Sequence, residues 1–460
     1  MTRRAQVPER SSASSAEPTT RSSGGQETAV GAITLKRASD LAGQAAFQWV
    51  SRAVVARSSA VTFEVLARVD DRLSTLISAL SKRPGLAERF LEDQPAAFPS
   101  GHTFVTAAVA LRSGAVGVFE ALVKDLESRD ELLPPLASAL AWFQYEEVNA
   151  WVKHLLASEA PTAVRLGLLA AVAHRVNPGA PLNRALDAED PRLRGTALEA
   201  AGRLGARAFA PRLRAALEDE DVMCRFWGAW STVRFGDGAG LSVLGRFASE
   251  GGPLGKPACD MVLRALDPVR AVHAHARLAS VNGDKRLGVL AAGIIGDPAL
   301  AEWLLGEMAS PAVARPAGAA FCLMTGCDLR RNDLDADRPP AAPDPEVVPP
   351  DESVSDGATT QEAPRLDDSS LAEESDDDLA WPDLVKLPRW WDSNRHAFVP
   401  GTRYLSGLPI RQAEMVHVLR QGNQQQRAAA ALELALLDPE TPVMDVTGPA
   451  QRQTRLGSFS

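Results

Sequence analysis

The chain has 460 residues, of which 45% are hydrophobic and only 5% aromatic, and its net charge is −9. This length is enough to bury a sizeable core and to hold more than one folded region. Few aromatic and many small apolar residues favour closely packed helices over sheets. No apolar run reaches the roughly 18–20 residues of a membrane span, and the N-terminus lacks the apolar core of a secretory signal peptide.

The cysteine content indicates a reducing compartment. Four cysteines in a chain of this length are too few for a disulfide framework. Since no export signal is recognisable, we expect a cytoplasmic protein.

Charge is distributed unevenly. Residues 333–378 hold 16 acidic and two basic residues, a balance of −14, so the remainder of the chain is weakly positive. No strongly basic domain stands out, and we therefore do not expect nucleic acid as the main partner.

The N-terminal part divides into a tail and a helical region. Residues 1–36 are rich in Ser and Arg and contain scattered Pro, which predicts a disordered tail. Residues 37–157 show apolar residues at the helical period, and we predict an N-terminal helical region there.

The middle of the chain, residues 158–328, repeats a pattern about every 30 residues. Each unit contains a basic residue that opens an Ala-, Gly- and Leu-rich segment, with steps of 29, 31, 31, 30 and 29 residues between the basic positions. This ladder consists of Arg165, Arg194, Arg225, Lys256, Arg286 and Arg315. A fixed period of this length predicts an all-α, HEAT-like helical-repeat solenoid.

The units also carry helix boundary signals. Asp190 and Asp221 precede the second helix of their units and suit N-cap positions, whereas Gly205 and Gly236 follow it and suit the left-handed helix end.

The ladder has two interpretations. Such residues often bond the Asp and carbonyls of the adjacent turn and so tie repeats together. Alternatively, the ladder lines an exposed stripe that binds anions, because the guanidinium fork suits either role. The second interpretation keeps a nucleic-acid-binding protein, or an enzyme acting on DNA bases, as an alternative function.

Two further segments follow the array. Residues 329–378 are acidic, rich in Pro and poor in large apolar groups, which predicts a disordered linker. Residues 379–460 contain two helix-like stretches, and we predict a C-terminal helical segment that docks on the array as a cap.

The C-terminal segment also contains candidate binding residues. Large aromatic and basic side chains gather where other apolar residues are few: Trp390, Trp391, Phe398, Arg403, Tyr404 and Arg427. They either anchor the segment to the array or form a hot spot for a partner, since Trp, Tyr and Arg dominate such sites.

Motifs for chemistry are incomplete. A phosphate-binding loop ends in Gly-Lys-Ser/Thr, but here Pro257 replaces the hydroxyl residue. An Asp-x-Asp-x-Asp stretch begins at Asp333 like a calcium loop, but Arg338 occupies the Gly position. Cys322 and Cys327 are a weak indication of a metal site. We expect no catalytic residues, no metal and no cofactor.

The C-terminal sequence RWWDSNRHAFVPGTRYLSG, followed by QGNQQQRAAAALELALL, resembles the end of a bacterial family of HEAT-like-repeat proteins. Genes of that family often lie near type VI secretion genes. The resemblance extends from about Gln44 to the C-terminus. It implies a repeat fold and a secretion-related context, and it implies no catalytic residues.

These observations lead to one main functional hypothesis. We expect a non-enzymatic HEAT-like adaptor or scaffold that binds a protein partner. The repeat alone would also suit a lyase that attaches bilin pigments, but nothing else in the sequence favours that function.

Overall fold

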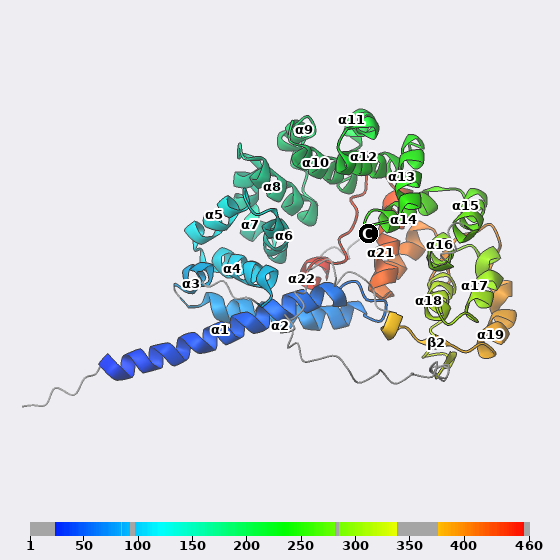
Figure 1. The fold of residues 1–460 in the computed structure, drawn as a ribbon, viewed down its shortest axis with the longest axis horizontal. Coiled ribbons are helices and arrows are strands. Elements are labelled where there is room, and N and C mark those ends of the chain that lie inside the picture. The colour runs from blue at the N-terminus through cyan, green and yellow to red at the C-terminus, as the bar shows by residue number, and fades with distance from the viewer. Residues whose placement is uncertain (1–23, 84, 93–96, 281–284, 338–375, 455–460) are drawn as a thin grey trace, which may run out of the picture.

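A computed structural model describes residues 24–83, 85–92, 97–280, 285–337 and 376–454. The described residues form 22 α-helices and two short two-stranded sheets, which confirms the predicted all-α fold (Figure 1). Most of the predicted acidic linker, residues 338–375, lies outside the described residues.

The N-terminal helices pack together before the regular array begins. Helices α1, α2 and α4 contact one another, and α3 lies against α4. Helix α1 begins at Gly24, so it extends into residues predicted as tail. Residues 27–38 consist largely of helix formers, which explains the difference. The bounds are α1 Gly24–Val55, α2 Phe63–Ser81, α3 Leu86–Glu92, α4 Pro99–Ser113, α5 Val116–Asp125, α6 Leu133–Trp142 and α7 Tyr145–Leu156.

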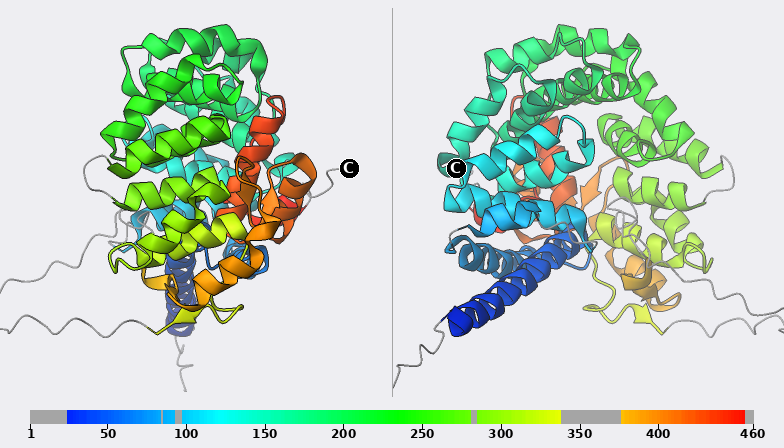
Figure 2. Two further views of the ribbon diagram at one scale, coloured as in Figure 1. Left: turned by 90° about the vertical axis from the view of Figure 1, so that its right-hand side faces the viewer. Right: turned by 60° about the vertical axis from the view of Figure 1, so that its left-hand side comes forward.

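The array is a curved, two-layered stack of helices. Each even-numbered helix from α4 to α18 packs on the next even-numbered one and forms an inner layer. Helices such as α9, α11, α15 and α17 lie on the outside of the arc (Figures 1 and 2). The bounds are α8 Pro161–His174, α9 Ala180–Ala185, α10 Pro191–Arg203, α11 Ala210–Ala215, α12 Val222–Arg234, α13 Ala239–Glu250, α14 Gly255–Ala265, α15 Pro268–Ser280, α16 Lys285–Ile295, α17 Ala301–Glu307 and α18 Ala314–Thr325.

The layered arrangement starts earlier than the predicted array. Helices α4 and α6 already belong to the inner layer, although they lie before residue 158. Neither has a basic residue in its first turn, so the feature that marks the period in the sequence is missing there.

The predicted helix boundary signals are confirmed. The Asp190 and Asp221 side chains accept hydrogen bonds of 2.9 Å from the backbone N–H three residues later, at the starts of α10 and α12. Gly205 and Gly236 have φ values of +71° and +81° just after the same helices.

The C-terminal segment returns along the array to the N-terminal helices. Strand β1 (Asp335–Ala336) pairs antiparallel with β2 (Trp381–Pro382), so the two ends of the predicted linker lie side by side. The other elements are α19 Lys386–Asn394, β3 Tyr404–Leu405, β4 Leu408–Pro409, α20 Gln412–Gln421, α21 Gln424–Leu437 and α22 Ala450–Thr454.

We call residues 401–453 the clasp. The clasp begins against α18 through β3 and ends with α22 against α2. In Figures 1 and 2 it runs from orange to red between the two ends of the arc. It therefore joins the last repeat to the first helices of the chain.

Substitutions at two equivalent glycines test the contact between the array and the clasp. A Cβ at Gly205 would lie 2.8 Å from the Glu440 carbonyl carbon, whereas a Cβ at Gly236 would meet nothing within 4 Å. Since both residues have positive φ, we expect Gly236→Ala to cost about 1 kcal/mol of unfolding free energy and Gly205→Ala at least about 2 kcal/mol. Urea denaturation of both variants measures the difference, and equal losses would contradict the contact.

Candidate functional site

The first half of the basic ladder connects neighbouring repeats. Arg165 Nη1 donates to Asp130 Oδ1 at 2.5 Å. Arg194 makes a bidentate pair with Asp219 of the next unit, at 2.7 and 2.9 Å. Arg225 Nη1 donates to the carbonyls of Asp219 and Glu220, at 2.7 and 2.8 Å. These are the contacts that the structural interpretation of the ladder describes.

Arg194 also fixes the charge of its partner. The hydrogen bond from Arg194 holds the pKa of Asp219 below its ordinary value, against the opposing effect of partial burial. Asp219 therefore stays ionised and connects two ladder arginines, one through its carboxylate and one through its carbonyl.

The second half of the ladder meets the end of the acidic linker. Arg286 makes a bidentate pair with Asp376 at 2.5 and 2.8 Å, and Arg315 Nη1 donates to the Asp376 carbonyl at 2.7 Å. The Arg315 guanidinium lies 4.6 Å from the ring centroid of Trp381. Lys256 occupies the equivalent helix position with an exposed side chain.

The opposite edge of the inner layer carries the helix C-termini, and the clasp runs along it. Helix ends leave their last carbonyls without intrahelical donors. Ser406 N and Gly407 N donate to the carbonyls of Leu323 and Met324, in α18, at 2.7 and 2.9 Å. Tyr404 N donates to Gly296 O, just past α16, at 2.8 Å.

The clasp continues along the ends of the preceding inner helices. Arg403 Nη1 donates to the carbonyl of Arg264, in α14, at 2.9 Å. Val443 N donates to the carbonyl of Arg203, in α10, at 2.8 Å. Near the end of the clasp, the Arg452 side chain donates to the carbonyl of Ala173, in α8. Residues 403–407 thus meet α14, α16 and α18 in forward order. From Glu433 onwards the clasp follows the repeats in reverse, from α14 to α8.

A buried charge cluster holds the clasp to the array. Glu433, in α21, accepts from Arg264 at 2.8 Å and from Arg403 at 2.5 Å. Arg264 also pairs with Asp260 at 3.0 Å. The Glu433 side chain is only 3% exposed, so its charge is balanced by arginines rather than by water.

Aromatic side chains fill the space between α18 and the segment that leads into the clasp. The Phe321 ring lies 6.0 Å from Trp390 and 5.7 Å from Trp391, and the contact continues from Trp391 to Phe398 at 5.4 Å. Phe398 lies 5.0 Å from Tyr404. Three of these four ring pairs pack edge to face, an arrangement that adds to the stability gained by burial.

The far end of the clasp docks on α1 and α2. Arg52 forms a bidentate ion pair with Asp70, and both residues contact the clasp. Arg52 donates to the carbonyls of Thr447 and Gly448 at 2.8 and 2.9 Å, while Asp70 accepts from Ala450 N at 2.7 Å.

Arg427 is buried inside the clasp. Its side chain donates to Leu419 O at 2.8 Å and to Gln453 Oε1 at 2.6 Å, and it lies 4.8 Å from the Phe63 ring centroid. All six residues proposed from the sequence as anchors or partner contacts therefore make contacts within the molecule. Their geometry fits the anchoring interpretation.

The sequence reasoning missed several residues of this site. Asp70 interrupts the apolar stripe of α2, between Leu66 and Leu73, and Glu433 interrupts the apolar run of α21. A charged residue at a buried helix position is itself a signal, because it requires a partner. The partners Arg52 and Arg264 have no such signal in the sequence.

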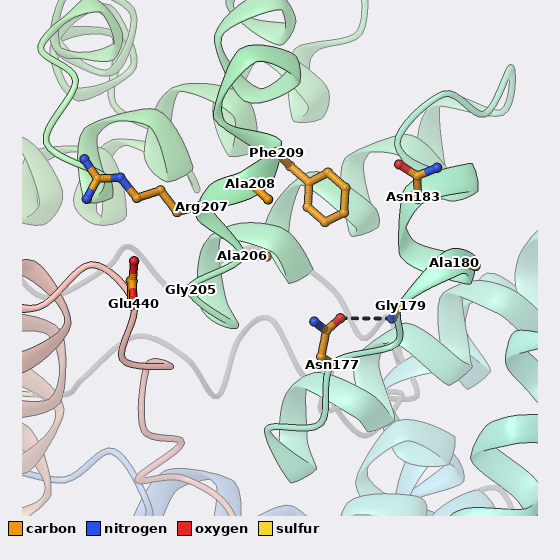
Figure 3. Close-up of a pocket in the computed structure, with 10 residues that line it drawn as sticks. All are labelled: Asn177, Gly179, Ala180, Asn183, Gly205, Ala206, Arg207, Ala208, Phe209 and Glu440. Atoms are coloured by element: carbon orange, nitrogen blue, oxygen red, sulfur yellow. Dashed lines mark hydrogen bonds between the residues drawn. The ribbon is translucent and has the colours of Figure 1, made fainter.

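Two surface hollows accompany the clasp. The first, about 650 Å³, lies where Glu440 passes the loops that follow α8 and α10 (Figure 3). Arg207 and Glu440 are the charged residues that line it. Asn177 Oδ1 accepts a hydrogen bond from Gly179 N at 2.9 Å. The second, about 410 Å³, lies over the Glu433 cluster, whose arginine donors are already bonded to the protein.

In the described part of the chain, no three His, Cys, Asp or Glu side chains gather as a metal-binding group. No described helix has both the length and the apolar character to cross a bilayer. In comparisons with known proteins, no family model matches the chain and no curated protein is significantly similar to it.

Removing the charge of Glu433 should weaken the fold strongly. Glu433→Gln leaves Arg264 and Arg403 buried without their shared anion, and we expect a loss of about 3–5 kcal/mol in unfolding free energy. Glu440→Gln, at an exposed position of the clasp, is the matched control. Similar denaturation curves for the two variants would contradict the role of the cluster.

His174 should make the protein sensitive to mild acid. Burial, with a smaller effect of the nearby Arg452 charge, lowers the pKa of His174 from 6.5 to about 4. Between these values the unfolded chain binds the proton and the folded chain does not, so stability falls as the pH drops from 6.5 towards 4. We expect His174→Gln to reduce this loss in denaturation at pH 7 and pH 5, and replacement of exposed His417 to leave it unchanged.

Proposed function

We propose that this protein is a non-enzymatic HEAT-like-repeat adaptor that binds a protein partner through its array. The observation that carries the proposal is that the anchoring side chains of the C-terminal segment bind to the array and not to an outside partner. The aromatic and basic side chains of the C-terminal segment are used to close the molecule on itself. The repeats therefore offer the surface for recognition, as is usual for stacked-helix proteins.

The first turn of α12 is the strongest candidate for the contact. Val222 and Met223 are adjacent, 47% and 43% exposed, and lie between the ladder residues Arg194 and Arg225. Glu189 and Glu220 are exposed on the preceding turns. An apolar centre beside the exposed carboxylates of Glu189 and Glu220 suits a partner that contributes an apolar side chain and at least one basic group.

A second exposed apolar pair makes the C-terminal segment the alternative binding surface for a partner. Leu384 and Val385 precede α19 and are 52% and 57% exposed. We favour α12 because the ladder contacts of Arg194 and Arg225 hold the loop before this helix in place.

The proposal includes a cytoplasmic location, which rests on the low cysteine content, and a type VI secretion-related complex, which rests on the sequence resemblance. We do not extend it to nucleic acid. The guanidinium groups of Arg194, Arg225 and Arg286 are bonded to carboxylates or carbonyls, and they do not line an open basic groove.

Affinity purification from the native host, followed by mass spectrometry, tests the proposal. We expect the Val222→Asp/Met223→Asp variant to lose a protein that the wild-type chain retains, because two charges disrupt an apolar contact. Val269→Asp is the matched control, since Val269 is 64% exposed at the start of the outer helix α15.

The remaining outcomes separate the alternatives. Loss of the partner only with Leu384→Asp/Val385→Asp would move recognition to the C-terminal segment. Recovery of nucleic acid without any protein, sensitive to salt, would overturn the adaptor proposal.

A further inference from the structure

Two cysteine sulfurs lie in contact at the end of the array. Cys322 is in the last turn of α18 and Cys327 follows the helix, yet their Sγ atoms are 3.3 Å apart. Gly326, with φ +75°, folds the chain back over the helix end, and its N–H donates to Cys322 O at 2.8 Å. The turn itself therefore brings the thiols together.

The other two cysteines have a different environment. Cys224 and Cys259 are buried in the core, and burial raises the pKa of each thiol to about 12. Cys224 Sγ donates to the carbonyl of Pro191 at 3.2 Å. Both are inert thiols by this criterion and serve as internal controls.

The contact between the paired thiols shifts their pKa values in opposite directions. The hydrogen bond from Cys322, helped by the Thr325 hydroxyl at 3.3 Å, lowers the pKa of Cys327 against the effect of its burial. The same contact and burial raise the pKa of Cys322 well above its usual value. Cys327 is thus the more acidic thiol of the pair, and Cys322 is the proton donor beside it.

We propose that Cys322 and Cys327 form a redox-active dithiol, which hydrogen peroxide oxidises to an intramolecular disulfide at the place where the clasp docks. This modification site is independent of the adaptor proposal, because it rests on the sulfur geometry alone.

The chemistry requires peroxide as the oxidant. The Cys327 thiolate attacks one peroxide oxygen, the O–O bond breaks, and the departing hydroxide takes up a proton to leave as water, which gives a sulfenic acid. Cys322 then attacks this sulfur, the S–S bond forms and the S–O bond breaks. The hydroxide released takes the Cys322 proton and leaves as a second water. Two thiols and one peroxide become one disulfide and two waters.

The disulfide would act on the surface that holds the clasp. The carbonyls of Leu323 and Met324, between the two cysteines, accept the backbone N–H groups of Ser406 and Gly407. A disulfide requires a sulfur separation of about 2.05 Å, so the turn must rearrange from the present 3.3 Å contact. We therefore infer that oxidation loosens this end of the clasp.

Peptide mapping of the full-length protein tests the site. Trypsin does not cut between Arg315 and Pro316, so both cysteines fall in the tryptic peptide 287–330, which holds no other cysteine. After peroxide treatment, denaturation and alkylation, we expect this peptide to lose the mass of two hydrogens and to take no label. A dithiol reductant should restore both labels, while Cys224 and Cys259 remain labelled throughout.

Variants separate the two steps. In Cys322→Ser we expect no disulfide and a sulfenic acid at Cys327 that dimedone traps. The Cys224→Ala/Cys259→Ala variant should form the disulfide as the wild type does. Full labelling of Cys322 and Cys327 after peroxide, or equal oxidation of all four cysteines, would overturn the proposal.

Hydrogen exchange tests the coupling to the clasp. We expect the amides of residues 403–410 to exchange several-fold faster in the oxidised wild type than in the reduced protein, and no such change in peroxide-treated Cys322→Ser. A disulfide that forms without this change would overturn the coupling.

Discussion

The unsatisfied carbonyls at the helix C-termini of the inner layer are the constraint on which this structure depends. Six inner helices, from α8 to α18, present these groups along one edge of the array. Backbone N–H groups and arginines of the clasp donate to carbonyls at the ends of five of these helices. At α12 the direction is reversed, because Arg234, its last residue, donates to the clasp carbonyls of Pro439 and Thr441. Buried charge pairs then hold the clasp on the array, because separating a pair would leave an uncompensated ion in the interior.

The fold was predictable because the repeat is local. The 30-residue period, the caps at Asp190 and Asp221, and the left-handed glycines all follow from neighbours in the sequence. The start of the array was missed because α4 and α6 lack the basic residue that marks each later unit.

The clasp site was predictable only in part. Trp391, Arg403 and Arg427 stand out in the sequence as unusual residues. Arg403 and Arg427, however, donate partly to backbone carbonyls, which every residue has. Glu433 pairs with Arg264, which is 169 positions away, and no periodic pattern in the sequence predicts a contact over such a separation.

The long sequence separation between the clasp and the first helices has a consequence for synthesis on the ribosome. Solenoids commonly fold by adding each new repeat to the previous one as the chain emerges. Here Arg52 obtains its Gly448 acceptor only after 396 more residues have been made. The inner edge therefore stays open to solvent and to chaperones until the clasp has been made, and docking of the clasp is the event that closes the molecule.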